Sequence, residues 1–301
     1  MLERMNALFS IIVPSYNRQQ DILQLLVSLN QQTIKNFEVI VVDDCSPIPI
    51  QIEQEFSFPL RIIRNQKNSG PAISRNVGAQ HALNEWLLFL DDDDRFVDNK
   101  CQLLTELITP NSTCNFIYHP AECLMVNQGF TYFTHPYSDP KMLTLDNLLG
   151  GNKLGGMPMI AIKNAFFQQL GGLSDKLRSL EDYDFVLKLV SNPEFSPAYL
   201  DNALTKCTFH TKRASVSTDT TNTELAIEQI REQYVKTPQQ QQKFNVNALY
   251  MLAYPNIMNL SRKAAKYYWQ MFKLSHSAKH LMMAVATFIS PSLAINLKRF
   301  I

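Results

Sequence analysis

The chain has 301 residues, of which 46% are hydrophobic and 18% are charged. This composition excludes a disordered chain and is typical of a globular protein with a sizeable core, and the length is enough for one large domain or two smaller ones. The net charge of +1 gives no indication of a nucleic-acid partner.

The charges are distributed unevenly along the chain. All 27 Asp and Glu residues lie within the first 232 positions, whereas nine of the 28 Lys and Arg residues follow Glu232. An acidic body with a basic tail suggests a partner on the side of the tail. The five cysteines show no CxxC spacing, which indicates reduced thiols in a cytoplasmic protein. We find no secretory signal and no run of about 20 apolar residues, so we expect no membrane-spanning helix.

The first hundred residues alternate predicted strands and helices. Apolar residues at helical spacing predict a helix over 18–32, and Gly70-Pro71 opens a second helix. Strands separated by helices imply right-handed crossovers, and therefore a mostly parallel α/β sheet with helices on both faces. The apolar runs predict its strands at 9–13, 37–42, 60–63 and 86–90.

The pattern is less regular between about 110 and 215 and becomes helical after Asn222. We place a domain boundary here, with an α/β domain over 1–215 and a helical, basic region over 216–301. The glycines of 147–159 indicate a mobile loop, 181–190 predicts an amphipathic helix, and 206–217 predicts a strand followed by a polar loop. In the last region, we expect helices interrupted at Pro238, Pro255 and Pro291, with the polar run 239–242 as a connection.

Polar segments follow three of the predicted strands. Residues 14–17 (Pro-Ser-Tyr-Asn) follow the first strand, Asp43-Asp44 follows the second, and Asp91 to Asp94 follow the fourth. The carboxyl ends of parallel strands share one edge of the sheet, and ligands bind in the crevice beyond that edge. The sequence therefore predicts a polar binding site to which three separate segments contribute.

The four adjacent aspartates repel one another unless something compensates their charge. Asp91 and Asp93, spaced i and i+2, would point to the same side, toward one pocket. A hard divalent cation prefers carboxylate oxygens and shares its coordination with substrate phosphates, so it would remove the repulsion. The alternative is a solvated acidic turn that caps a helix near 98–107.

Five segments together resemble family 2 glycosyltransferases, which have the GT-A fold. They are FSIIVPSYNR, FEVIVVDDCS, NSGPAISRNVG, LLFLDDDDRF and SLEDYDFVLKL, in the family's order and approximate spacing, and the resemblance covers residues 9–215. The third fits the pattern N-x-G-x-x-x-A-R-N-x-G, with Ser74 in place of Ala. The resemblance implies a Rossmann-like GT-A domain over 1–215 that transfers a sugar from a nucleotide diphosphate donor.

The resemblance also implies which residues bind the nucleotide. The segment beside the base would contain Pro14, Tyr16 and Asn17. Asp44, or its neighbour Asp43, would accept a hydrogen bond from a uracil N–H, and Arg75 would contact the nucleotide.

A metal site follows from the same resemblance. Asp91 and Asp93 are similar to the D-x-D pair, of which the first contacts the ribose and the last holds Mn²⁺ or Mg²⁺ on the diphosphate. Because the middle residue is also an aspartate, either Asp92 or Asp93 takes the metal. His210 would contact the metal or the diphosphate, and the segment that follows it, through Ser217, would close over the donor.

Sugar transfer also needs a base, because an alcohol is a poor nucleophile until its proton is leaving. Glu181-Asp182 resembles the E-D motif of the family, which implies that Asp182 is the base, with Glu181 as the second choice. A single base that attacks opposite the leaving group inverts the anomeric centre. The alternative is that these acids only stabilise a helix N-terminus.

The basic tail resembles no family, but its composition suggests a surface for a partner. Aromatic residues such as Trp269 and Phe272 alternate with lysines such as Lys266 and Lys273. This pattern suits the face of an anionic membrane, where a lipid-linked acceptor would lie. Packing against the catalytic domain and a homodimer interface are the alternatives.

These features lead to a metal-dependent, inverting glycosyltransferase, with a UDP-sugar as the expected donor. Its acceptor would be a hydroxyl of a glycan or lipid-linked molecule in surface polysaccharide, capsule or lipopolysaccharide synthesis, on the inner face of the cytoplasmic membrane. One alternative is a nucleotidyltransferase, although residues 14–17 lack the Gly-rich, basic phosphate loop that it would need. The other is a non-catalytic membrane-associated scaffold of the same fold.

Overall fold

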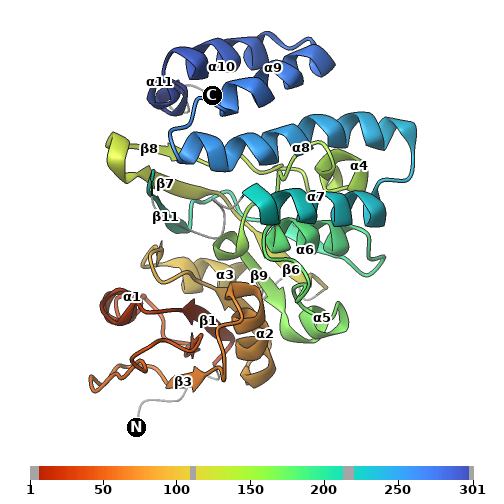
Figure 1. Cartoon of the computed structure of the whole chain (residues 1–301). Helices are drawn as coiled ribbons and strands as arrows, with labels where there is room; N and C mark the ends of the chain where they lie inside the picture. Colours follow the sequence, from red (N-terminus) through yellow and green to blue (C-terminus); the bar gives the residue numbers. More distant parts are fainter. Residues whose placement is uncertain (1–6, 109–112, 213–219, 298–301) are drawn as a thin grey trace.

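Two sheets form the centre of the molecule in the computed structural model, which describes residues 7–108, 113–212 and 220–297 (Figure 1). In the larger sheet only β9 runs antiparallel to its neighbours, which confirms the predicted mostly parallel α/β architecture. Its strands, in spatial order, are β10 (Pro197–Tyr199), β6 (Phe116–Tyr118), β9 (Ile160–Lys163), β4 (Trp86–Phe89), β1 (Phe9–Ser15), β2 (Phe37–Asp43) and β3 (Leu60–Arg64). The smaller sheet has the order β5 (Arg95–Phe96), β11 (Thr205–Phe209), β7 (Ala121–Met125) and β8 (Phe130–Phe133).

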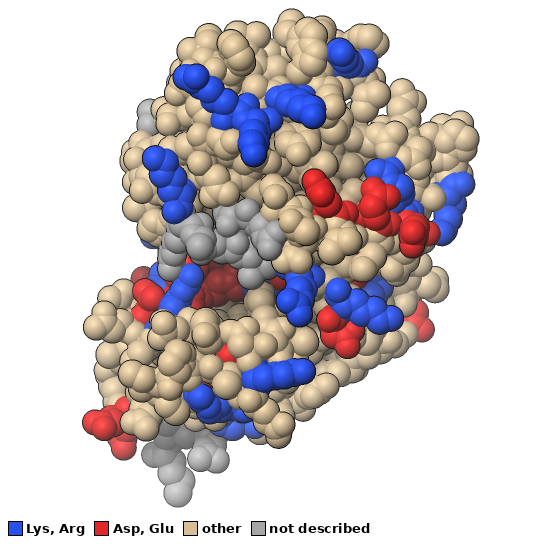
Figure 2. Space-filling model, viewed as in Figure 1, with Lys and Arg blue, Asp and Glu red and all other residues tan. Residues whose placement is uncertain are grey.

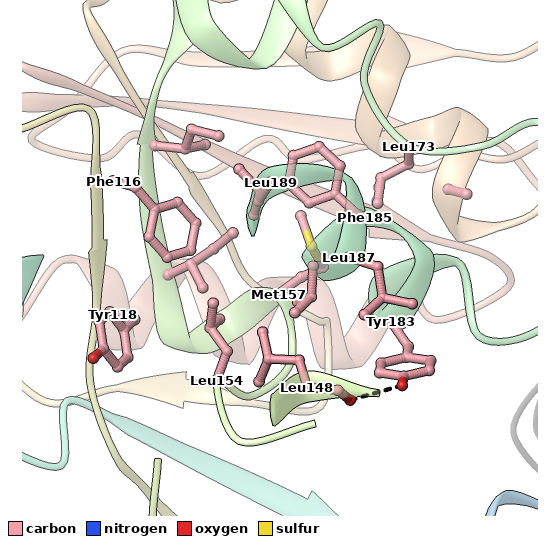
Figure 3. Close-up of a cluster of buried hydrophobic side chains, with 14 of the residues drawn as sticks. Phe116, Tyr118, Leu148, Leu154, Met157, Leu173, Tyr183, Phe185, Leu187 and Leu189 are labelled. Carbon is pink, nitrogen blue, oxygen red and sulfur yellow. Dashed lines mark hydrogen bonds between the residues drawn. The ribbon is translucent and has the colours of Figure 1, made fainter. Parts of the chain in front are cut away.

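Helices cover both faces of the larger sheet. Successive side chains of a strand point to opposite faces, and the apolar side chains of β1 are buried on both of them. Ile11 and Val13 of β1 pack with α1 and α3, whereas Ile12 packs with α2, α5 and α6. Figure 3 shows part of this second cluster, around Phe116 and Phe185. The helices are α1 (Gln19–Leu29), α2 (Pro71–His81), α3 (Lys100–Ile108), α5 (Asn164–Gln169) and α6 (Glu181–Val190).

The C-terminal helices divide between two hydrophobic clusters. Ile230 of α7 (Thr220–Tyr234) and Phe244 of α8 (Pro238–Met258) are buried in the same cluster as Phe185 of α6. The helices α9 (Ala264–Ser275), α10 (Ala278–Ile289) and α11 (Pro291–Asn296) instead form a layer over the end of α8, next to β7 and β8 (Figure 1). One core thus joins residues on both sides of the predicted boundary at 215.

Two of the predicted interruptions in the last region are wrong, because α8 is a single helix. Residues 239–242 form its first turn, since Thr237 makes a capping box with Gln240 and so satisfies backbone N–H groups at the helix start. Pro255 lies inside the helix, one turn before its end at Met258. A proline inside a helix removes one backbone hydrogen bond. Pro255 does not end the helix at once, and only one more turn follows it. Pro238 and Pro291 start helices, as expected.

The glycine-rich stretch 147–159 is anchored by apolar side chains. Leu149, Leu154 and Met157 are buried in the core cluster, and the hydroxyl of Tyr183 donates a hydrogen bond of 2.8 Å to the carbonyl oxygen of Leu148 (Figure 3). The short helices of this part of the chain are η1 (Val126–Gln128), η2 (Pro140–Met142), α4 (Leu145–Leu148) and η3 (Met157–Met159). Among the described residues no helix has the length and apolarity to cross a bilayer, and the five cysteines are free thiols.

Candidate active site

A cavity of about 1210 Å³ begins at the carboxyl ends of β1, β2 and β4 and extends to α8, α9 and α10. In the same region Figure 2 shows acidic side chains gathered in a hollow near the middle of the molecule. The cavity brings together most of the predicted site residues, from segments far apart in the sequence. Those that line it are Pro14, Tyr16, Asp44, Arg75, Asp91, Asp92, Asp93, Glu181, Asp182 and His210.

Asn17 and Asp43 are the two predicted site residues that do not line the cavity. The Asp43 carboxylate accepts hydrogen bonds from the backbone N–H of Ser46 at 2.8 Å and from Arg64 at 2.5 Å. The backbone N–H of Asn17, which has a positive φ of 56°, donates to the hydroxyl of Ser46 at 2.8 Å. Both residues therefore hold the loop after β2 in place, and of the two adjacent aspartates only Asp44 borders the cavity.

The NSGPAISRNVG motif fixes the start of α2 against the sheet. Asp44 accepts hydrogen bonds from the backbone N–H groups of Ser69 and Gly70, at 2.9 and 2.7 Å. At the other end of the motif, a Cβ on Gly78 would lie 2.4 Å from Cγ2 of Ile12 in β1. Only glycine permits this close approach of helix and strand, and it places the motif's arginine at the cavity wall.

The four aspartates all border the cavity, but they differ in exposure. The side chains of Asp91 and Asp93 are 35% and 29% exposed, whereas that of Asp92 is 8% exposed and Asp94 is buried. Asp94 accepts a hydrogen bond of 2.9 Å from the backbone N–H of Thr208, and burial raises its pKa to about 8. Asp91 and Asp93 are thus the carboxylates that remain accessible from the cavity.

Asp92 is held by neighbours on the loop after β1. One of its oxygens accepts from the hydroxyl of Ser15 at 2.8 Å, and the other from the guanidinium of Arg18 at 2.5 Å. Arg18 also pairs with Asp93 at 2.9 Å. Burial raises the pKa of Asp92 to about 6 in spite of the opposing effect of Arg18. Both oxygens of Asp92 are therefore engaged by protein donors.

Arg75 connects the two acidic motifs. Its guanidinium lies 2.5 Å from Asp91 and 3.8 Å from Glu181, and its side chain is only 7% exposed. Its Nε is buried and has no hydrogen-bond partner among the described residues. A buried donor without an acceptor is costly, so this atom is available to an oxygen of a bound molecule.

Glu181 and Asp182 are the first two residues of α6 and border the cavity together with Asp91 and Asp93. Asp182 Oδ1 accepts a hydrogen bond of 2.8 Å from the backbone N–H of Tyr183. Burial raises the pKa of both acids, and the Arg75 charge opposes the shift. A carboxylate with a raised pKa binds a proton more readily, which is what a general base requires.

The donor set fits a hard divalent cation that is partly coordinated by a substrate. Within residues 7–108, 113–212 and 220–297 no three His, Cys, Asp or Glu side chains form a cluster that could hold a metal without other ligands. Asp91 and Asp93 supply two accessible carboxylates, and His210 lines the same cavity. Mg²⁺ commonly takes one or two carboxylates and completes its coordination with phosphate oxygens and water. The segment 213–219, predicted to close over the donor, lies outside the described residues.

Sequence reasoning missed several residues of the cavity. Arg18 directly follows the predicted nucleotide segment, and a cation beside four aspartates could have been identified from that position. The residues from the C-terminal helices gave no signal, because helical spacing alone does not reveal which face borders a cavity. They include Tyr250, Tyr254, Tyr268, Lys279 and His280.

A sheet with acids at its carboxyl edge, a helix-borne carboxylate and one shared cavity is the arrangement expected of a glycosyltransferase with the GT-A fold. Residues 10–166 match the family described as glycosyl transferase family 2. The chain belongs to this family, and the assignment disfavours the nucleotidyltransferase alternative.

Relatives and solved structures support this placement. The chain is 58% identical over 292 residues to a protein of Haemophilus influenzae described as an uncharacterized glycosyltransferase, covering 97% of this chain and 99% of the relative. It is 29% identical over 155 residues to the Escherichia coli UDP-Glc:alpha-D-GlcNAc-diphosphoundecaprenol beta-1,3-glucosyltransferase WfgD, covering 51% and 59%. The structure of Staphylococcus aureus TarS 1–349 in complex with UDP-GlcNAc is similar with a TM-score of 0.57 at 21% identity, over 97% of this chain and 91% of that one. This last likeness shows the fold.

Proposed function

We propose that the protein transfers a sugar from a UDP-sugar to a hydroxyl group of a surface glycan or lipid-linked acceptor, with inversion at the anomeric carbon. The observation that carries this proposal is the shared cavity of Asp91, Asp93 and Asp182. It places two carboxylates suited to a diphosphate-bound cation and one buried carboxylate suited to a base around the same space.

The donor end of the cavity suits a uridine diphosphate. Tyr16 is 46% exposed beside Pro14, so its ring is available to stack on a base. Asp44 offers a carboxylate at the cavity wall, and the Arg75 Nε offers a donor for a phosphate or ribose oxygen. The WfgD relative is described as using UDP-Glc, and the TarS structure is a complex with UDP-GlcNAc.

Asp91 and Asp93 would hold Mn²⁺ or Mg²⁺ in this proposal, with His210 as a further contact. The cation, when bound, would stabilise the negative charge that develops on the departing diphosphate. Arg18 orients Asp92 and Asp93 by pairing with both. In the absence of the cation, the same pairing offsets part of the repulsion between neighbouring aspartates.

Asp182 would take the proton of the attacking hydroxyl as the bond to the sugar forms. Its burial raises its pKa, and it lies at the N-terminus of α6, where the positive end of the helix dipole favours the ionised form. Glu181 pairs with Arg75 and therefore serves to orient that guanidinium. A base on one face of the sugar and a diphosphate leaving from the other give inversion.

The C-terminal helices offer a surface for the membrane that carries a lipid-linked acceptor. Met282, Val285, Phe288 and Ile289 of α10 are 44–72% exposed and share one helix face. In Figure 2 the upper part of the molecule, which contains α9 and α10, carries basic side chains and no acidic ones. An apolar face with surrounding cations suits the inner, anionic leaflet. Replacing Val285 and Phe288 with Glu should abolish co-sedimentation with vesicles that contain phosphatidylglycerol, and unchanged binding would remove this part of the proposal.

A panel of nucleotide sugars tests the donor assignment. In the presence of Mn²⁺, we expect the chain to hydrolyse at least one UDP-sugar slowly, with no hydrolysis after chelation. In calorimetry, Asp93→Ala should lose Mn²⁺-dependent UDP binding. Asp175→Ala is the matched control, because Asp175 is exposed and lies outside the cavity. Equal UDP binding by Asp93→Ala and the wild type would refute the metal role of Asp93.

A further inference from the structure

The end of the cavity that lies away from the donor acids has a different composition. Its walls come from α8, α9 and α10, and they consist largely of tyrosine and methionine side chains, including Tyr250, Tyr254, Tyr268, Met271 and Met283. Such walls suit sugar faces and hydrocarbon, which need few hydrogen bonds. A nucleotide held at Asp91 and Asp93 leaves this part of the cavity for the second substrate.

In addition to Arg18, Arg75 and His210, the cavity is bordered by three basic side chains: Lys153, from the loop before η3, and Lys279 and His280, from the first turn of α10. Within the described part of the chain, neither lysine has a carboxylate at ion-pair distance. The acids of the cavity come from the sheet edge and from α6 instead. The cavity is therefore negatively charged where the donor is expected and positively charged at its other border.

The two lysines lie close enough to influence each other. Partial burial and the charge of Lys153 both lower the pKa of Lys279, and burial together with Lys279 lowers the pKa of His280. The hydroxyl of Ser275 lies 2.6 Å from Nδ1 of His280 and holds the imidazole ring in place. Two ammonium groups that face one space are stabilised by an anion placed between them.

The basic group also lies near the proposed base. Lys153 is three residues before Gly156, and a Cβ on Gly156 would lie 3.9 Å from Oδ2 of Asp182. Three residues span at most about 11 Å. A compact molecule can therefore contact Lys153 and Lys279 at one end and present a hydroxyl to Asp182 at the other.

We propose that Lys153, Lys279 and His280 form an acceptor subsite that binds a phosphate or diphosphate group of the sugar acceptor. The adjacent tyrosine and methionine walls contact the rest of that acceptor. This inference rests on the proposed function, because it takes Asp182 as the base toward which the acceptor hydroxyl points. Beyond the proposed function, the inference specifies that the acceptor carries a phosphate or diphosphate group, and it names the residues that recognise this group.

Binding of geranyl phosphate to the full chain, measured by calorimetry with EDTA present, tests the subsite. Without a cation, the aspartates repel phosphate, so binding reports on the basic end of the cavity. The double variant Lys153→Gln/Lys279→Gln should bind at least about tenfold more weakly than the wild type. The matched control is Lys67→Gln/Lys176→Gln, which removes the same charge from exposed positions outside the cavity and should bind as the wild type does.

Two further ligands separate the possible sources of the phosphate. Tighter binding of geranyl phosphate than of inorganic phosphate or geraniol supports a lipid-linked acceptor, whereas equal binding of both phosphates supports a phosphorylated soluble glycan. Equal affinity of the two double variants for geranyl phosphate, or no binding by the wild type, overturns the subsite. If the wild type hydrolyses no UDP-sugar in the presence of Mn²⁺, the proposed function is overturned instead. The binding of geranyl phosphate in EDTA does not depend on that activity and still tests the subsite.

Discussion

The two ends of the cavity differ in the elements that supply them and in how their side chains are held. At the donor end, Asp44, Asp92 and Asp94 follow strands or strand-linked turns, and each accepts a hydrogen bond from a named neighbour. At the other end the lining comes from helices, and it consists mainly of aromatic and methionine side chains. The donor end is thus specified by directional contacts, and the other end by packing.

This difference has a consequence for which part of the chain can vary. Hydrogen-bonded carboxylates tolerate few changes, because an unpaired buried partner is costly. An apolar wall tolerates replacement by side chains of similar volume. We therefore expect the donor end to be common to related enzymes and the helical end to adapt to each acceptor.

The largest expected effect tests the chemical role of the donor end. Asp182→Asn keeps the size and hydrogen bonding of the side chain but cannot accept the proton, so transfer should fall by about 10²- to 10⁴-fold, with UDP binding unchanged. Because burial raises the pKa of Asp182, the wild-type rate should also decrease as the pH falls through that raised value. Steady-state rates and calorimetry measure both.

The matched control for this variant is Asp184→Asn. Asp184 lies on the same helix and bonds to Tyr234, but it does not line the cavity. It should keep most of the transfer rate. If instead Asp182→Asn retains its rate and Glu181→Gln loses it, the base is Glu181.

The next effect tests whether the helical region is part of the catalytic core. Phe244 of α8 is fully buried in the cluster that contains Phe185, so Phe244→Ala should lower the free energy of unfolding by about 3–5 kcal/mol. Phe288→Ala, at a position that is 72% exposed, should change it by less than about 0.5 kcal/mol. A single shifted denaturant transition is expected for Phe244→Ala, and a separate transition for the helices would contradict a shared core.

The last prediction concerns the pH dependence of stability through Lys100, which is fully buried. Its ammonium donates to the Pro158 carbonyl oxygen at 2.9 Å and to the Thr205 hydroxyl at 3.1 Å. Burial lowers its pKa to about 7. Between about pH 7 and 10 the unfolded chain therefore binds one more proton at this site than the folded chain, and the free energy of unfolding rises by up to about 1.4 kcal/mol per pH unit.

Denaturant titrations at several pH values measure this contribution. Lys100→Met fills a similar volume, and the Thr205 hydroxyl, 2.7 Å from the Pro158 carbonyl oxygen, remains to pair with it. The difference between wild type and variant should therefore change steadily from pH 7 to pH 10 and become constant above that range. A difference that does not depend on pH would show that Lys100 titrates normally.

The sequence predicted the donor end well, because its signals are local. Apolar runs followed by Asp43-Asp44 and by Asp91 to Asp94 specify strands with acids at their ends, and all four residues of Asp91 to Asp94 border the cavity. The pairing of Arg18 with Asp92 and Asp93 was not predicted, since it joins side chains 74 and 75 positions apart. The continuous helix α8 was not predicted, because each proline was expected to interrupt a helix. The capping box at the start of α8 and the position of Pro255 close to its end explain why the helix is continuous.

The sequence by itself determined the order of strands and helices, the acids at the strand ends and the Glu181-Asp182 pair at a helix start. Each of these depends on neighbours within one turn or one strand. Only the tertiary structure decided that α8, α9 and α10 complete the same cavity, that Lys153 and Lys279 both border it, and that Arg18 pairs with both Asp92 and Asp93. These features depend on which faces of distant elements pack together, and helical periodicity gives the apolar face of a helix without giving its partner.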